Sequence, residues 1–271
     1  MQPFVKPKYI DWIIKESDVV FEDDIPLECY QITYDMKEET VLDEWATHIR
    51  RHYITDSDLV DSITRLETDE KTYLKENVIP QKEQPQGPST ISAEIAEILL
   101  YDLFEYILRY TAFRGRHWDK PTPTSPIQGT DVFAAKIANE NKASIKDELC
   151  IIEVKSTLTK NDYEILENAK RHSDKDTLRY SVSLDFLRKK YRDKNENLLM
   201  RLVERFQQKA NLPYISKYIA AGVISRKDIQ GKKIIGIKGK DLEIKFSNQM
   251  FLIHGENLMN LAYEIYKRIT K

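Results

Sequence analysis

The chain has 271 residues, 41% of them apolar and 32% charged, with a formal net charge of -2 at pH 7. These values allow a sizeable globular core and exclude a strongly basic protein that binds nucleic acid through its overall field, so any such contact must use a local basic face. Two cysteines cannot by themselves build a disulfide scaffold or a zinc site, and the eight glycines form no phosphate-cradling loop. No stretch approaches a membrane span, so we expect a cytoplasmic protein without membrane contact.

Residues 1–80 are expected to form an N-terminal segment or subdomain. It opens with aromatic and acidic residues, a composition that makes it a candidate for docking a partner. In "TVLDEWATHIRRHYI", four apolar residues recur at helical spacing and predict a stripe that faces the core. They are Leu42, Trp45, Ile49 and Tyr53.

The stretch "NVIPQKEQPQGPST" carries three prolines, one glycine and no periodicity, which is typical of a linker or long loop. We place a domain boundary here and expect residues 89–271 to form the main domain. Thr90 or Ser92 is expected to cap the start of "ISAEIAEILLYDLFEYILRY", a helix of about five turns.

Glu97 projects into an apolar face of this helix, beside Leu100 and Tyr101. A carboxylate in such a face is unfavourable unless a cation or hydrogen bonds compensate it. Glu97 is therefore either half of a buried salt bridge, for example with Lys155, or an acidic ligand of a metal site, and we favour the second interpretation. A narrower polar strip on the same helix is expected to face solvent. It comprises Glu94, Asp102 and Glu105.

The loop "FRGRHWDK" follows this helix and supplies three cations around an aromatic side chain. Guanidinium and ammonium groups with an interleaved aromatic residue suit phosphate contact and base stacking. We predict that Arg114, Arg116 and Lys120 contact nucleic acid, and the alternative is a solvated basic loop.

Two runs, "TDVFAAKI" and "LCIIEVKST", are joined by a polar turn and predict a β-hairpin. Alternate side chains of a strand share a face, so Glu153 and Lys155 point the same way. Any symmetric register of the hairpin brings Asp131 close to both of them. Gly129 comes shortly before and lets the backbone bend sharply and approach a ligand. Two carboxylates and a lysine are therefore expected to converge at one end of the hairpin.

This convergence supplies the groups that phosphodiester hydrolysis needs. Two carboxylates can hold a hard divalent cation such as Mg²⁺, with Mn²⁺ as a substitute. The metal lowers the pKa of a bound water and polarises a phosphoryl oxygen, while a lysine orients the water and offsets charge on the phosphate. We predict Asp131, Glu153 and Glu97 as metal ligands and Lys155 as a further catalytic residue. The alternative is an exposed edge strand with a cross-strand salt bridge.

The rest of the chain completes an α/β pattern. Residues 162–209 predict helices rich in lysine and arginine. Short strands are then predicted at "YIAAGVIS", "KKIIGIKG" and "DLEIKFSN", before the closing helix "NLMNLAYEIYKRI". We therefore expect a mixed central sheet flanked by helices. His172 and His254 have no partners at ligand spacing and are interpreted as structural.

The candidate residues resemble the PD-(D/E)XK nuclease superfamily. In that superfamily an acidic helix residue, a strand aspartate and a Glu-x-Lys strand bind Mg²⁺ and cut nucleic acid. The matching positions here are Glu97, Asp131, Glu153 and Lys155. The proline-aspartate pair of the motif is replaced by Gly129-Thr130-Asp131. The resemblance implies a restriction-endonuclease-like core.

A closer resemblance is to the HamA family, the nuclease subunits of the Hachiman anti-phage defence system. It depends on "EWATHIRRHYI", "SAEIAEILLYDLF", "GTDVF" and "IIEVKS", which occur in that order within about residues 40–160. Most relatives have glycines where this chain has Ala93 and Ala96. The resemblance implies a bacterial deoxyribonuclease that acts on DNA. It also implies a superfamily-two helicase partner, HamB, which holds the nuclease inactive until phage-associated DNA damage or DNA ends are sensed.

Two other functions stay open at this point. A stand-alone restriction endonuclease or junction resolvase would need no partner and would cut a defined duplex into discrete fragments. A catalytically inactive, DNA-binding regulatory subunit would keep Lys155 for a salt bridge and would bind no Mg²⁺.

Overall fold

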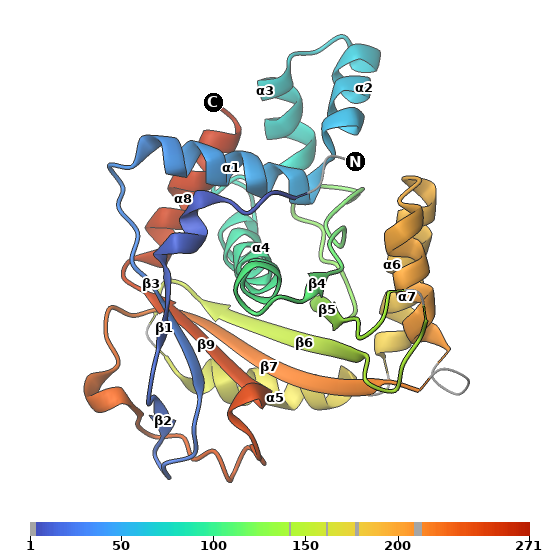
Figure 1. Ribbon diagram of the computed structural model, residues 1–271. Helices are drawn as coiled ribbons and strands as arrows, with labels where there is room; N and C mark the ends of the chain where they lie inside the picture. Colours follow the sequence, from blue (N-terminus) through green and yellow to red (C-terminus); the bar gives the residue numbers. More distant parts are fainter. Residues whose placement is uncertain (1–3, 141, 161, 177–178, 209–212) are drawn as a thin grey trace.

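The computed structural model describes residues 4–140, 142–160, 162–176, 179–208 and 213–271. It confirms the expected α/β class: a seven-stranded mixed sheet with the order β1-β3-β9-β7-β6-β5-β4 is flanked by helices, and β2 and β8 form a separate parallel pair (Figure 1). The strands are β1 (Ile13–Glu16), β2 (Val20–Phe21), β3 (Glu28–Ile32), β4 (Thr111–Ala112), β5 (Val132–Lys136), β6 (Glu148–Thr157), β7 (Ile215–Ser225), β8 (Lys233–Ile234) and β9 (Met250–Gly255). This architecture is compatible with a restriction-endonuclease-like core.

Helices cover both faces of the sheet. The α-helices are α1 (Glu39–Tyr53), α2 (Asp56–Leu66), α3 (Glu70–Tyr73), α4 (Gly87–Asp102), α5 (Glu164–Asp176), α6 (Tyr180–Asp193), α7 (Asn197–Gln207) and α8 (Leu258–Ile269). Figure 1 shows α4 against one face, with α1 and α8 beyond it, and α5 against the other face. Within the described ranges, none of the helices combines the length and the apolar character that crossing a bilayer requires.

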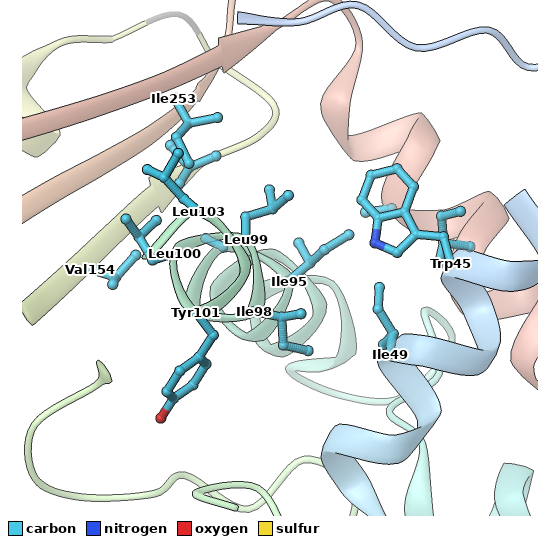
Figure 2. Packing of buried hydrophobic residues seen from close by; sticks show 14 of the residues in the cluster. Trp45, Ile49, Ile95, Ile98, Leu99, Leu100, Tyr101, Leu103, Val154 and Ile253 are labelled. Atoms are coloured by element: carbon cyan, nitrogen blue, oxygen red, sulfur yellow. The ribbon is translucent and has the colours of Figure 1, made fainter. Parts of the chain in front are cut away.

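The N-terminal segment shares this sheet and its core. β1 pairs with β3 in antiparallel fashion, and β3 lies parallel to the late strand β9. The predicted stripe of α1 is confirmed, because Leu42, Trp45, Ile49 and Tyr53 are all buried. In Figure 2, Trp45 and Ile49 of α1 reach toward Ile95 of α4. Residues 1–80 and residues 89–271 therefore contribute to one continuous hydrophobic cluster.

The helix that carries Glu97 begins earlier than expected, at Gly87 instead of near Thr90 or Ser92. Pro88 lies in its first turn, where backbone N–H groups have no intrahelical acceptor, so the N–H that proline lacks is not needed there. A side chain at Gly87 would meet the carbonyl oxygen of Gln81. The helix is buried almost all round, between the sheet and two other helices, and it continues into a π-helical turn at Leu103–Ile107.

The strand predictions after residue 213 are correct only in part. "YIAAGVIS" lies in β7, but "KKIIGIKG" contributes only the two residues of β8, and "DLEIKFSN" is wrong as a strand. Positive φ angles at Gly236 and Glu243 turn the chain there. The strand is instead "MFLIHG", β9, which lies between β3 and β7. All six of its residues are buried, so it lacks the alternation that marks a half-exposed strand.

Candidate functional site

The β5–β6 hairpin brings Asp131 beside Glu153. The strands are antiparallel with Val132 opposite Ile152, so the next step of the register sets Asp131 opposite Glu153, on the same face of the sheet. Asp131 Oδ2 also accepts a hydrogen bond of 2.9 Å from the backbone N–H of Val154. This bond holds the aspartate against the strand that carries Glu153, and both carboxylates are buried.

Lys155 lies against Glu153, as the strand alternation requires. Its Nζ donates to Glu153 Oε1 at 2.6 Å, and His172 Nδ1 of α5 lies 3.5 Å from the same oxygen. Burial lowers the pKa of Lys155, but the hydrogen bond and the charge of Glu153 outweigh that effect and leave the pKa raised. Lys155 is therefore a charged donor beside the carboxylate. His172 is a neighbour of this site that the sequence interpretation missed, because only the tertiary packing of α5 on β6 brings it there.

Glu97 of α4 reaches the same site through Arg116. The guanidinium of Arg116 lies between two carboxylates, with Nε 3.0 Å from Glu97 Oε2 and Nη2 3.0 Å from Asp131 Oδ1. It also donates to the backbone carbonyl of Thr130 at 2.7 Å. Burial raises the pKa of Glu97 and the charge of Arg116 lowers it, but the neighbouring carboxylates of Asp131 and Glu94 raise it again and leave the pKa well above its usual value. Arg116 is thus the cation that compensates this buried acidic site.

The donor set fits a hard divalent cation. A pocket of about 460 Å³ is lined by Glu97, Asp131, Lys155 and Arg116. Glu97 Oε2 is buried and accepts no well-aligned hydrogen bond among the described residues, although Arg116 Nε lies 3.0 Å and His117 Nε2 lies 3.5 Å from it. Carboxylate oxygens with unsatisfied lone pairs are what Mg²⁺ prefers.

Arg116, however, occupies the space between two of the predicted metal ligands. Among the described residues, two groups bring three ligand atoms within 4.8 Å of one another. They are Glu16, Cys29 and His254, and His48, His52 and Asp102. The predicted ligands Glu97, Asp131 and Glu153 are not among these groups. A cation bound to all three carboxylates would therefore need Arg116 to move away, or would have to share Glu97 and Asp131 with it.

The three cations predicted to contact nucleic acid lie inside the protein. Arg116 is paired as described, and Lys120 Nζ donates to Glu94 Oε1 at 2.5 Å. Arg114 is 4% exposed and pairs with Asp102 at 2.7 Å and with Glu105. Their charges are thus directed at carboxylates of α4 and its extension, and nucleic-acid contact by these residues stays a prediction.

The predicted polar strip supplies the carboxylates of those pairings, and the expectation that it faces solvent is wrong for Glu94 and Asp102, whereas Glu105 is partly exposed. Asp102 is fully buried, where it accepts a hydrogen bond from the hydroxyl of Tyr9 and contacts His48 Nε2 at 2.9 Å as well as Arg114. Glu94 is also buried. The compensating groups come from parts of the chain far from α4 in sequence, which helical periodicity cannot reveal.

A second and larger groove adjoins the site. Its volume is about 990 Å³, and it runs between the loop that ends at Gly129 and one side of α6. Arg179, Phe186 and Lys190 of this region line it, with Phe186 half-exposed and the ammonium of Lys190 4.9 Å from the centre of its ring. Ser183 connects the groove to the site, because its Oγ accepts a hydrogen bond of 3.0 Å from the backbone N–H of Thr130. An aromatic ring and two cations thus lie beside the carboxylate site.

We expect the Arg116→Ala variant to be less stable than the wild-type protein without divalent cations and to be rescued by Mg²⁺. Removing the guanidinium leaves the buried carboxylates of Glu97 and Asp131 without compensation, which costs about 1–3 kcal/mol of unfolding free energy. A cation bound between the carboxylates would replace the lost charge. Thermal unfolding in EDTA and in Mg²⁺ measures the effect.

Arg179→Ala is the matched control, because Arg179 is exposed in the adjoining groove. Mg²⁺ is expected to raise the melting temperature of Arg116→Ala by several degrees more than that of the control, as binding to the folded state requires. If Mg²⁺ does not raise the melting temperature of Arg116→Ala, no divalent cation binds between Glu97 and Asp131, and equal rises in the two variants would mean that Arg116 does not compete with the cation.

Comparison with known proteins adds one finding to this geometry. The family model described as HamA matches residues 7–269, which is nearly the whole chain and includes β1, β3 and α1 as well as the candidate site. No curated protein matches the chain.

Proposed function

The chain belongs to the HamA family, and from this premise we propose that it is a metal-dependent DNA nuclease, the effector subunit of a bacterial anti-phage defence complex. Membership in the family supports a role in anti-phage defence. The nuclease activity is our inference from the site. The observation that carries it is the convergence of Asp131, Lys155 and Glu97 of α4 at one pocket, with Glu153 opposite Asp131 and hydrogen-bonded to Lys155.

Each residue of the site has a role that its surroundings support. Asp131, Glu153 and Glu97 would hold Mg²⁺, or Mn²⁺ in its place. When bound, the metal would supply a nucleophilic water at neutral pH and polarise the phosphoryl oxygen. The Val154 N–H fixes the carboxylate of Asp131 in position. Lys155, charged and next to Glu153, would position the attacking water and stabilise negative charge on the scissile phosphate.

The groove along α6 is where we propose that the DNA lies. Its exposed ring, Phe186, can stack on a base, and the exposed Arg179 can contact a phosphate, whereas Lys190 faces Asp119 at 3.8 Å in the same groove. The groove adjoins Gly129 and Thr130, which lead directly into Asp131. A strand held there would reach the carboxylate site without any need to expose Arg114 or Lys120.

A helicase subunit is the partner that we propose to restrain this nuclease. Resemblance to the Hachiman system supports this proposal, and such control suits an enzyme that would otherwise cut the DNA of its own cell. An adjacent superfamily-two helicase gene in the native operon, and co-purification of its product with this chain, would support the pairing. Activity of the chain alone on one defined sequence would favour a stand-alone restriction endonuclease or junction resolvase instead.

The test of the proposed function is plasmid nicking by protein purified from the native operon, with and without Mg²⁺ and ATP. We expect nicking in Mg²⁺ or Mn²⁺ and its complete loss in EDTA, because the carboxylates alone cannot activate water. Cutting that persists in EDTA would contradict a metal mechanism. Absence of both cutting and Mg²⁺ binding, the latter measured by calorimetry, would support an inactive, DNA-binding regulatory subunit.

A further inference from the structure

Three potential metal ligands meet at the edge of the sheet that the N-terminal strands form. Glu16 of β1 is directly opposite Cys29 of β3, and His254 of β9 is paired with Gln31, two residues further along β3. Directly paired residues share a face, and so do residues two apart along a strand. The register of three strands therefore sets Glu16, Cys29 and His254 on one face of the sheet.

The distances among these groups suit a tetrahedral metal site. Cys29 Sγ lies 3.7 Å and His254 Nε2 lies 3.1 Å from the same oxygen, Glu16 Oε2, and the three ligand atoms are all within 4.8 Å of one another. In a tetrahedral zinc site with metal–ligand bonds of about 2.0–2.3 Å, neighbouring ligand atoms lie roughly 3.3–3.7 Å apart. The side chains thus need only small adjustments to surround an ion.

The other nitrogen of His254 is already engaged in the way that metal-binding histidines require. His254 Nδ1 lies 3.0 Å from the backbone carbonyl oxygen of Arg226, and a carbonyl can only accept, so Nδ1 carries a proton. This bond fixes the orientation of the ring and directs Nε2 at Glu16, an outer-shell arrangement typical of metal sites. In a neutral imidazole, the Nε2 lone pair then faces the lone pairs of a carboxylate at 3.1 Å.

That contact requires a positive charge between the two groups. A proton on Nε2 would let His254 donate to Glu16 Oε2, to which the thiol of Cys29 also donates at 3.7 Å, and this is the arrangement without a metal. A transition-metal ion would engage all three. Both Cys29 and His254 are fully buried, whereas the side chain of Glu16 is partly exposed, so an ion could enter from that side.

We propose that Glu16, Cys29 and His254 bind one divalent transition-metal ion of the zinc class, with a fourth position for water. Thiolate and imidazole ligands select such an ion over Mg²⁺. The site shares no residue with the carboxylate site at Asp131 and does not depend on the proposed nuclease activity. It would link the β1–β3 hairpin to β9, and thereby fasten the N-terminal segment to the central sheet.

Cobalt is the probe for this site, because a thiolate–Co²⁺ bond gives a strong charge-transfer absorption in the near ultraviolet and carboxylate-bound Co²⁺ does not. We expect titration of the reduced, full-length protein with Co²⁺ to develop this band and to saturate at one equivalent. The Cys29→Ser variant should lose the band. Cys150→Ser is the matched control, since Cys150 is the other buried cysteine and lies on β6, so it should keep the band. Glu153→Gln should also keep it, which separates this site from the carboxylate site.

His254→Gln gives a second test that leaves the thiol in place. It should weaken Co²⁺ binding by more than the roughly 10–100-fold that the loss of an outer-shell partner causes. Circular dichroism of each variant verifies that it folds. If a variant fails to fold, the titration of the wild-type protein with Co²⁺ still tests whether a thiolate binds the metal. A wild-type protein without the thiolate band, or Cys29→Ser with the band intact, would overturn the proposal in favour of a protonated His254 paired with Glu16.

Discussion

Replacing Lys155 with alanine is expected to slow Mg²⁺-dependent DNA cleavage by at least roughly 10²–10³-fold. The Nζ of Lys155 lies 2.6 Å from Glu153 Oε1 and is the charged donor beside the carboxylates that would hold the metal. Without it, the attacking water loses its positioning group and the phosphate loses a compensating charge. Initial rates of plasmid nicking by the purified complex, at one Mg²⁺ concentration, measure the effect.

The variant should remain folded, because about a third of the Lys155 side chain is exposed, and it should still bind its partner. Lys146→Ala is the control: Lys146 is an exposed lysine in the turn of the same hairpin, and its removal should leave the rate unchanged. Glu153→Ala should match the loss seen for Lys155→Ala. If Lys155→Ala nicks plasmid as fast as the wild-type complex, the site assignment is wrong.

Replacing Arg114 with alanine is expected to lower the free energy of unfolding by about 3–5 kcal/mol, because the change strands a buried carboxylate. Arg114 and its partner Asp102 are both buried, with their charged atoms 2.7 Å apart. Burial raises the pKa of Asp102, but the charges of His48 and Arg114 outweigh that effect and hold the pKa below its usual value. Loss of Arg114 removes one of the two charges that compensate Asp102. Urea-induced unfolding of the two proteins measures the difference.

Arg65→Ala is the control for this prediction, because Arg65 pairs with Asp61 on the exposed surface of α2 and such pairs contribute little. It should change the unfolding free energy by less than about 0.5 kcal/mol. The experiment also separates the two interpretations of Arg114. An arginine that contacts phosphate would, when removed, weaken DNA binding and leave stability within about 1 kcal/mol of wild type, contrary to the structural role proposed here.

The hairpin of the candidate site could be predicted from the sequence because its determinants are local. The alternation of side chains along "LCIIEVKST" sets Glu153 and Lys155 on one face, and a symmetric pairing of the two strands sets Asp131 opposite Glu153. The burial of Glu97 followed in the same way from the periodicity of its helix. Each of these inferences needs only the geometry of one element or of two neighbouring strands.

The partners of buried charges could not be predicted in this way. Arg114 and Arg116 belong to a loop whose composition suits an exposed nucleic-acid contact, yet the fold directs both at carboxylates of α4, and Arg116 also at Asp131 just before β5. His254 has no ligand partner nearby in the sequence, but β9 lies parallel to β3 and brings it to Cys29 and Glu16.

The sequence by itself therefore determined the elements around the site and the side chains that each presents, since helical and strand periodicity act over a few residues. Only the tertiary structure decided which buried cation pairs with which carboxylate. A buried ion is stabilised by any group that packs within a few ångströms of it, however far apart the two residues are in the sequence. The order of the seven-stranded sheet, with β9 between β3 and β7, belongs to the same class of long-range information.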